Sequence, residues 1–510
     1  MSEKTTIRAK KSIKNISLSA VSQIIIMTLG LLLPRIILTS FGSEINGLLS
    51  SLNQVYTYME LLRAGMGMAA IQAFYKPLNE ENYERISDII STSKNYFNKV
   101  GIYYLFGVFF ISLFFSVFGE TSFPHAYIFL VAFLQGISGW ITFTFIGYFS
   151  DFLRAEGKNY ILLLIQTSGH IAIQLSKILV LKYWQNIIIM QLFTICITSL
   201  EAFLFYLYRK TKYPQIELDH TPQMNLLQNR HSYLVFHVTG LICTSTDTVL
   251  ISILLGFEMA SVYAVYYLVI SAVNSIINTV YSSTSFLLGQ TYQDGIKKFT
   301  EVHDIYYLLY ITISSALFSV CCVLCIPFIR IYTRGITDIK YIYEYLPYLF
   351  CFSQILNASK NVGELTSNVG GCAKIVVPRA ITEATINFIV TVVLLNIIGI
   401  YGALIGTVIA GIYRAIDSLL LTNNRVMHRP PYKNLKVLLI NISLYTLIAL
   451  TFNHIDLDVG NYMSFVFCGI ILTIIFLILF SCVNISLNYP DVKMIKEIIN
   501  SIIQRRIKKN

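Results

Sequence analysis

Charged residues are scarce in this chain of 510 residues: Asp, Glu, Lys and Arg together make up 13% of it. Soluble globular proteins carry about 25% charged residues. Hydrophobic residues account for 55% of the chain and aromatic residues for 14%, although only two tryptophans are present. This composition excludes a water-soluble enzyme or binding domain as the main body of the chain. It predicts a protein that crosses a membrane many times.

The sequence also lacks the short motifs of common enzyme classes. It contains no GxxxxGK[ST] phosphate loop, no HExxH zinc motif and no GxSxG nucleophile motif. The nine cysteines fall almost all within apolar runs, and the one cluster, Cys321, Cys322 and Cys325, is interpreted as small buried hydrophobic residues rather than a metal site. We therefore expect a transporter and not an enzyme, with no bound cofactor.

Long hydrophobic runs are abundant, and about fourteen of them are long enough to span a bilayer as helices. The predicted fold class is an all-α polytopic membrane protein with two six-helix lobes around a central cavity and a C-terminal helix pair. The predicted parts are an N-terminal lobe at 1–208, a cytoplasmic linker at 209–230, a second lobe at 231–424, and a terminal pair with a basic amphipathic tail at 425–510. The predicted spans are 16–40, 47–75, 99–118, 126–150, 159–181, 186–208, 231–256, 259–289, 305–329, 341–366, 376–398, 400–422, 437–452 and 461–482.

Positive charge between the runs predicts the orientation. With a cytoplasmic N-terminus, the outside loops contain only Lys182, Arg330, Arg334 and Lys340, and the other loop Lys and Arg residues fall inside. This asymmetry follows the positive-inside rule and places both termini in the cytoplasm. The net charge of +11 therefore reflects membrane topology, and no nucleic-acid partner is expected. Inside, residues 79–98 are expected to form a polar, partly amphipathic connector.

A short repeat links the two predicted lobes. Gly42-Ser-Glu-Ile-Asn-Gly47 resembles Gly256-Phe-Glu-Met-Ala-Ser261, and both lie in predicted outside loops at equivalent places. Such internal symmetry is typical of transporters built by duplication.

Two charged residues, Glu60 and Arg63, fall near the middle of the second predicted span, one helical turn apart. A charge at the centre of a membrane helix costs about 2.5–3.5 kcal/mol on insertion scales. Two interpretations remain open: the residues pair with each other and hold helices in register, or they face a hydrated, ligand-binding cavity.

Polar stripes on other predicted spans supply further candidates. The buried cations favour an anionic substrate group such as a phosphate or pyrophosphate. The buried acids could bind a coupling ion or form structural pairs, as Arg414 with Asp417 would, while Lys177, Lys360, Glu201 and Glu364 could instead extend toward the membrane surface. The predicted substrate-binding residues are Arg35, Arg63, Lys177, Lys360 and Arg414; the predicted ion-coupling or pairing residues are Glu60, Asp247, Glu364 and Asp417.

Three stretches resemble the Wzx-type polysaccharide and O-antigen flippases of the multidrug/oligosaccharidyl-lipid/polysaccharide exporter superfamily. They are YMELLRAGMGMAAIQAFYKPLNEEN at 58–82, the region from Thr246-Asp247 to Val262-Tyr263, and the turn at 396–407. The resemblance implies alternating access and transfer of an undecaprenyl-pyrophosphate-linked oligosaccharide across the bacterial cytoplasmic membrane, driven by a proton or sodium gradient. It also implies glycosyltransferases and a polysaccharide polymerase as partners. Arg63 departs from the family pattern, which puts ion coupling through Glu60 in doubt and favours Asp247.

Other functions compete with this one. A drug or cation antiporter of the same superfamily should have a mainly acidic cavity, and here buried basic residues are at least as prominent. A membrane polymerase or ligase typically needs an extended outside loop, and none of the predicted outside loops is longer than about a dozen residues. A purely structural scaffold leaves so many intramembrane charges without a role.

Overall fold

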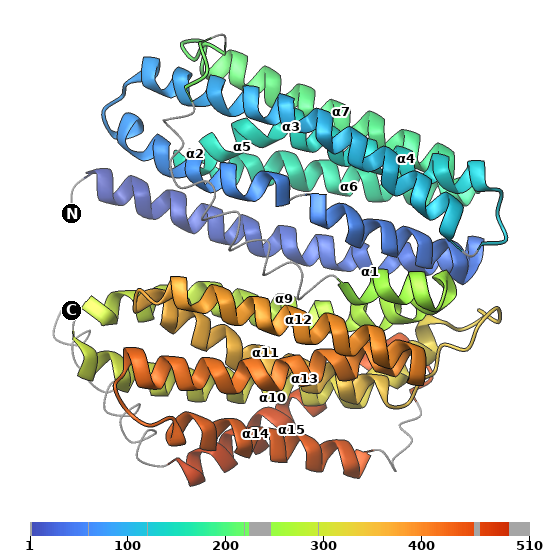
Figure 1. The fold of residues 1–510 in the computed structure, drawn as a ribbon, viewed down its shortest axis with the longest axis vertical. Helices are drawn as coiled ribbons and strands as arrows, with labels where there is room; N and C mark the ends of the chain where they lie inside the picture. The colour runs from blue at the N-terminus through green and yellow to red at the C-terminus, as the bar shows by residue number, and fades with distance from the viewer. Residues whose placement is uncertain are drawn as a thin grey trace. The chain divides into compact units, whose positions relative to one another are not determined.

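The computed structural model describes residues 3–59, 61–119, 121–218, 220–223, 246–293, 295–452 and 459–488. Within these residues the regular structure is helical, with fourteen α-helices of given bounds, a helical stretch at 246–254 and two short π-helices (Figure 1). Ten of the described helices are long and apolar enough to cross a membrane, judged by length and composition. The predicted all-α, multi-pass membrane fold is confirmed.

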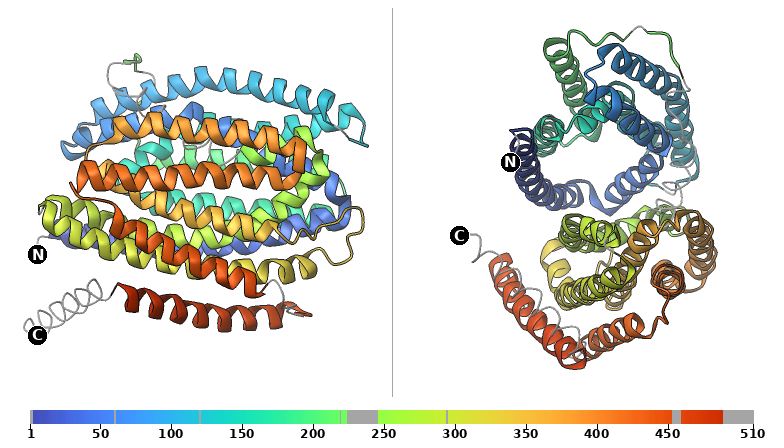
Figure 2. Two further views of the ribbon diagram at one scale, coloured as in Figure 1. Left: turned by 60° about the horizontal axis from the view of Figure 1, so that its bottom comes forward. Right: turned by 90° about the vertical axis from the view of Figure 1, so that its left-hand side faces the viewer.

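The chain divides into two compact units, Met1–Val262 and Tyr263–Asn510. Within each unit the helices run roughly side by side (Figure 2). The predicted lobe and linker boundaries stay predictions. The first unit contains α1 (Glu3–Met59), α2 (Leu61–Asn79), α3 (Tyr83–Phe118), α4 (His125–Ile141), η1 (Thr142–Ile146), α5 (Gly147–Ala155), α6 (Asn159–Tyr183) and α7 (Ile187–Lys212). The remaining elements are α9 (Phe257–Gln293), which begins in the first unit, then α10 (Ile296–Tyr332), α11 (Leu346–Val369), α12 (Ala373–Ile398), α13 (Ile400–Leu421), η3 (Thr422–Val426), α14 (Tyr432–Phe452) and α15 (Tyr462–Leu487).

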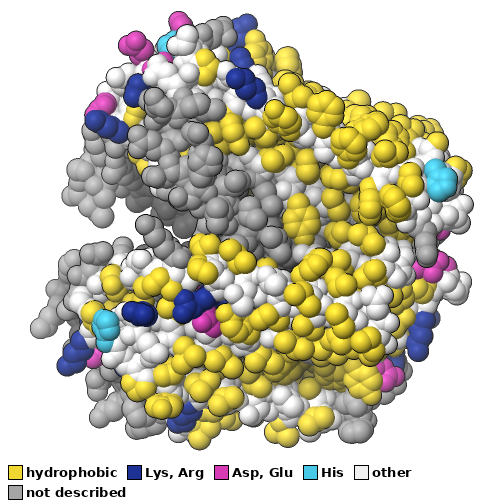
Figure 3. All heavy atoms as spheres, in the orientation of Figure 1, with side chains coloured by type: hydrophobic (Ala, Val, Ile, Leu, Met, Phe, Trp, Pro, Cys, Tyr) yellow, Lys and Arg dark blue, Asp and Glu magenta, His cyan; other side chains and the backbone are white. Residues whose placement is uncertain are grey.

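The surface of each unit matches a membrane environment. Hydrophobic side chains cover much of the face in Figure 3, and most charged side chains lie toward the ends of the helices. One small group of basic and acidic side chains lies amid hydrophobic ones over the second unit. Charges at this depth need partners, because lipid cannot solvate them.

The break predicted between the first two spans is a kink at one glycine. Gly42 has φ 81° and ψ −177°, a conformation that L side chains rarely adopt, and helix continues on both sides of it. Gly256, its counterpart in the repeat, has φ 88°. The two repeats also touch: the Asn46 Nδ2 donates to Ser261 Oγ at 2.8 Å, and a Cβ at Gly47 would overlap the carbonyl oxygen of Phe257. These contacts pack the two segments against each other within the first unit, and the repeat stays a prediction.

Helix α3 corrects one prediction. A polar connector was expected up to residue 98, but the helix begins at Tyr83 and runs unbroken to Phe118. The side chain of Asn82 caps the helix by accepting a hydrogen bond from the Arg85 amide at 2.9 Å. Ile86, Ile89 and Ile90 recur at helical spacing and are buried, so this segment is an amphipathic extension of the span.

Smaller differences concern other helix ends. Helix α10 begins at Ile296 rather than at 305, and α14 begins at Tyr432 rather than at 437, since both spans extend into polar residues. Of the span predicted at 231–256, residues 246–254 are helical and 231–245 lie outside the described residues. Glu60 and the basic tail after Pro490 also lie outside them.

Close packing of α12 against α13 organises the second unit. Gly402 and Gly406 are four residues apart on α13, and a Cβ at either would overlap α12, at Leu394 and Thr391 respectively. This is the small-xxx-small arrangement that lets membrane helices approach closely. Helices α14 and α15 pack on α10, where Asp304 accepts hydrogen bonds from Arg429 and forms an ion pair with Lys433.

Candidate functional site

Six charged side chains meet in the second unit, two from each of three helices. We call them the second-unit cluster. They are Lys360 and Glu364 of α11, Arg379 and Glu383 of α12, and Arg414 and Asp417 of α13. Three cations face three carboxylates, so the cluster is neutral when all six groups are ionised.

Arg414 is the centre of this cluster, and its side chain is 0% exposed. Its Nη2 donates to Glu364 Oε1 at 3.0 Å and its Nη1 donates to Asp417 Oδ2 at 2.8 Å. Its Nε lies 3.4 Å from Glu383 Oε2. Because guanidinium is planar and delocalised, one buried arginine can serve carboxylates on three helices at once. The pair of Arg414 with Asp417 that the sequence left open is present.

The rim of the second-unit cluster is more open than its centre. Lys360 Nζ lies 2.8 Å from Glu383 Oε1, and Arg379 Nε lies 2.8 Å from Asp417 Oδ1. The Lys360 side chain is 14% exposed and that of Arg379 is 34% exposed. The side chains of Glu364 and Asp417 are 25% and 18% exposed. Arg379 is therefore the most exposed member of the cluster, and Lys360 lies deeper than either of these carboxylates.

Local sequence explains how the cluster forms. Lys360 and Glu364 are four residues apart, as are Arg379 and Glu383, so each pair lies on one face of its helix. The glycine contact between α12 and α13 brings the backbones close enough for short bonds across them. A further hydrogen bond between α12 and α13 is donated by Asn387 Nδ2 to Thr407 Oγ1 at 3.0 Å.

A second group of charges lies in the first unit. This first-unit cluster consists of Arg63 on α2 with Ser150, Asp151 and Arg154 on α5. The Nη2 of Arg63 donates to Asp151 Oδ1 at 2.7 Å and to Ser150 Oγ at 2.6 Å. Arg154 interacts electrostatically with both Arg63 and Asp151. Among the described members, Arg63 is the hydrogen-bonded partner of the Asp151 carboxylate, and Arg154 adds a second positive charge near it.

Exposure differs within the first-unit cluster. The Asp151 side chain is 1% exposed, whereas that of Arg63 is 23% exposed. Gly67 makes room for the carboxylate, since a Cβ there would lie 3.0 Å from Asp151 Oδ2. The π-helix η1 precedes α5 and adds a wider turn, a feature frequent at functional sites. Arg63 is therefore held at one edge and accessible at another.

Asp151 was missed by sequence reasoning. It follows the predicted end of the span at residue 150, which places it in a loop, and the sequence offers Glu60, outside the described residues, as a partner of Arg63. An acidic residue one turn before Arg154 near the end of an apolar run was the available signal.

The other predicted residues lie elsewhere. Arg35 on α1, Lys177 on α6 and Asp247 in the helix at 246–254 are all partly buried. Thr246, beside Asp247, lies 2.8 Å from the hydroxyl of Tyr58, so this helix contacts α1. Of the nine predicted site residues, the structure brings together Lys360, Glu364, Arg414 and Asp417. Their assignment to substrate or ion binding stays a prediction.

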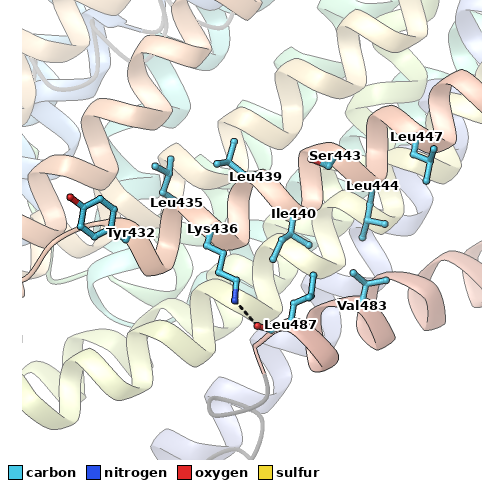
Figure 4. A pocket seen from close by; sticks show the side chains of 10 residues that line it. All are labelled: Tyr432, Leu435, Lys436, Leu439, Ile440, Ser443, Leu444, Leu447, Val483 and Leu487. Carbon is cyan, nitrogen blue, oxygen red and sulfur yellow. Dashed lines mark hydrogen bonds between the residues drawn. The ribbon is translucent and has the colours of Figure 1, made fainter.

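An apolar groove lies on the terminal helix pair (Figure 4). It has a volume of about 510 Å³ and is lined mainly by Leu and Ile side chains of α14, with Val483 and Leu487 of α15 opposite them. At one end, Lys436 Nζ donates to the carbonyl oxygen of Leu487 at 2.6 Å. The lining suits hydrocarbon and offers little to an ionic group, so this groove is chemically distinct from both charged clusters.

Sequence comparisons leave the family open: no protein-family model matches the chain, and no curated protein matches it significantly. Solved structures do resemble it. An inward-facing multidrug resistance MATE family transporter of the MOP superfamily is 14% identical with a TM-score of 0.63, covering 85% of this chain and 99% of its own. The lipid II flippase MurJ, in an inward closed conformation, is 16% identical with a TM-score of 0.61, covering 92% and 98%. The MATE multidrug transporter DinF-BH, in a ligand complex, is 14% identical with a TM-score of 0.60, covering 83% and 97%.

At these identities the likeness concerns the fold. The match extends over nearly the whole length of each neighbour, so no large part of the shared architecture is missing from this chain. The chain has the fold of MATE and MurJ transporters.

Proposed function

We propose that this protein is a flippase that moves an undecaprenyl-pyrophosphate-linked oligosaccharide across the bacterial cytoplasmic membrane by alternating access. The observation that carries the proposal is the first-unit cluster. There, Arg63 is hydrogen-bonded to Asp151 and its side chain is 23% exposed, and Arg154, exposed at the end of α5, adds a second positive charge nearby. Two accessible arginines attract an anion, and a pyrophosphate offers the oxygen acceptors that guanidinium binds best.

Asp151 has a positioning role in this proposal. It binds only one edge of Arg63, through Nη2, and fixes that side chain near Ser150. The remaining donors of a partly exposed guanidinium are then preorganised for a phosphate oxygen.

The second-unit cluster serves a different purpose in the proposed cycle. Its charges cancel and its central arginine is fully buried, so it joins α11, α12 and α13 into one body. Arg379, the most exposed cation of the cluster, and the partly buried Lys360 are its candidates for contacts with the sugar or phosphate. Coupling to a proton or sodium gradient, with Asp247 as the first candidate acid, belongs to the same proposal.

Support for a lipid-linked substrate also comes from the comparison with MurJ, which is named a lipid II flippase and covers 92% of this chain. The MATE transporters are named for multidrug resistance and favour a second candidate, export of cationic drugs. The charge balance of the first-unit cluster opposes it, because a cation would meet two arginines there.

The test is transfer of a labelled lipid-linked oligosaccharide in proteoliposomes, read by its accessibility to a membrane-impermeant glycosidase. We expect Arg63→Ala to lower the transfer rate at least about tenfold, since charge-assisted hydrogen bonds contribute about 1.5–3 kcal/mol. Lys182→Ala, which removes an exposed cation at the end of α6, is the matched control and should transfer normally.

Two results would overturn the proposal. One is normal oligosaccharide transfer by Arg63→Ala protein that is folded by size-exclusion chromatography. The other is transport of a fluorescent cationic dye, the kind of substrate expected of a cationic-drug exporter, by vesicles that do not move the oligosaccharide.

A further inference from the structure

The segment that follows α7 packs against the first unit. Residues 213–218 and 220–223, which we call the strap, run along the N-terminal half of α3 and are hydrogen-bonded to it. The Glu217 amide donates to Ser87 Oγ at 3.0 Å, Ser91 Oγ donates to the Glu217 carbonyl at 3.3 Å, and the Gln223 amide donates to Thr92 Oγ1 at 2.9 Å. Ser87, Ser91 and Thr92 are buried.

One end of the strap is anchored by groups that keep their state near neutral pH. Ile216 is 2% exposed, and its carbonyl accepts a hydrogen bond from Arg209 Nη1 at 3.2 Å. The Tyr213 hydroxyl contacts Lys158 Nζ at 2.6 Å and donates to the Glu156 carboxylate. Burial, followed by this contact with Glu156, raises the pKa of Tyr213, so its hydroxyl stays protonated.

The other end of the strap depends on a histidine. His220 Nδ1 lies 2.8 Å from Asp88 Oδ1 on α3, and His220 Nε2 lies 3.3 Å from Glu217 Oε2 within the strap. The further charged group described around this contact is Arg85, whose Nη1 lies 3.7 Å from Asp88 Oδ2. A doubly protonated imidazole satisfies both carboxylates at once, whereas a neutral imidazole can donate to only one.

We propose that the strap is a pH-dependent fastener: His220 in its protonated form holds residues 217–223 on α3, and loss of that proton releases them. The proposal stands on the two carboxylates at His220 and is independent of the substrate transported. The part of the strap from Glu217 onward, once released, adds up to about 25 Å of reach to the connection between α7 and the helix at 246–254 of the same unit. The strap therefore sets the reach of this connection in response to pH on its side of the membrane.

The sign of the effect follows from the pKa of His220. The hydrogen bond with Asp88 raises that pKa, against partial loss of hydration and with a further contribution from Glu217. A group whose pKa is raised on docking stabilises the docked state fully below its undocked pKa and loses that contribution as pH rises through the docked pKa. Fastening is therefore strongest at mildly acidic pH and weakens toward alkaline pH.

Hydrogen–deuterium exchange on the full-length protein in nanodiscs tests this, comparing about pH 6 with about pH 8.5, on either side of the range in which a histidine titrates. Rates are corrected for the intrinsic pH dependence of exchange. Protection of peptides within 214–223 should fall with rising pH, by about tenfold for each unit by which docking raises the pKa of His220. Peptides of α10 serve as the internal reference.

Variants separate titration of His220 from general loosening. His220→Lys should keep the strap protected at both pH values, because the ammonium stays charged. His220→Gln should leave the strap with the same low protection at both pH values, because glutamine carries no charge. His125, the first residue of α4, contacts Ser116 at the opposite end of α3. In His125→Gln, the protection of the strap should therefore change with pH as it does in the unmodified protein.

Two findings would overturn the proposal: equal protection of the strap at both pH values in the unmodified protein, or a pH response that persists unchanged in His220→Gln. Circular dichroism and the exchange rates of α10 peptides establish that each variant is folded. Absence of a pH response in the strap of a folded, unmodified protein then contradicts the proposal.

Discussion

The two charged clusters have similar residues and opposite properties. In the first unit, Arg63 is hydrogen-bonded to Asp151 and is 23% exposed, with the exposed Arg154 nearby. In the second unit, three cations and three carboxylates cancel, and Arg414 is fully buried. A partly exposed arginine that is held along one edge keeps donors available to a ligand, whereas a neutral, buried network mainly holds its helices together.

This difference separates two consequences of placing arginine inside a membrane protein. Removal of one partner from a buried ionic network leaves unpaired charge in a medium that solvates it poorly, and it costs about 3–5 kcal/mol. Removal of an exposed donor lets water take its place and affects binding more than folding. The variants below test whether the clusters divide in this way.

The largest effect is expected at the centre of the second-unit cluster. Arg414→Met leaves Glu364 and Asp417 without their main partner and should lower the free energy of unfolding by about 3–5 kcal/mol. Thermal unfolding in detergent measures this. Adding Glu364→Gln restores the balance of charge and should recover part of the loss. An Arg414→Met protein as stable as the unmodified chain would refute a structural role for the network.

In the first-unit cluster, Arg63→Lys should separate binding from folding. The lysine keeps a positive charge beside Asp151 but loses the planar fork of donors, so transfer of the lipid-linked oligosaccharide should fall about tenfold. The unfolding temperature should change little. If Arg63→Lys greatly lowered the unfolding temperature but left transfer normal, the first-unit cluster would be a structural site and not a binding site.

The packing beneath the second-unit cluster can be tested at a glycine. A Cβ at Gly406 would overlap Thr391, so Gly406→Ala should cost about 1–3 kcal/mol through overpacking. Gly411→Ala is a matched control on the same helix, because its Cβ would meet Leu356 at 3.4 Å, an ordinary contact. Equal unfolding temperatures for the two variants would mean that the close packing of α12 against α13 at Gly406 does not contribute to stability.

The smallest effect is expected at the rim. Arg379 is 34% exposed, and Asp417 keeps its bond to Arg414 when Arg379 is lost. Arg379→Gln should therefore change the free energy of unfolding by at most about 1 kcal/mol. A loss equal to that of Arg414→Met would show that the rim and the centre act as one unit.

Much of the fold could be predicted because hydrophobic runs and loop charges are local properties of the chain. The span from 400 to 422 and a break in the helix near Gly42 could be predicted without knowledge of neighbouring helices, although the break is a kink and not the expected loop. The start of α3 could not be found this way, since Ser87, Ser91 and Thr92 look like exposed loop residues and are buried beneath the strap. Their cover comes from residues more than a hundred positions later in the chain.

The amino-acid sequence alone was sufficient for the all-helical membrane architecture, because each span must be apolar whatever it packs against. It also identified Lys360, Glu364, Arg414 and Asp417 as unusual, since intramembrane charge is costly in any context. Which charges pair was decided in three dimensions. Arg63 bonds to Asp151, 88 residues away, and Arg414 reaches two other helices, because pairing depends on distances between helices that no local pattern contains.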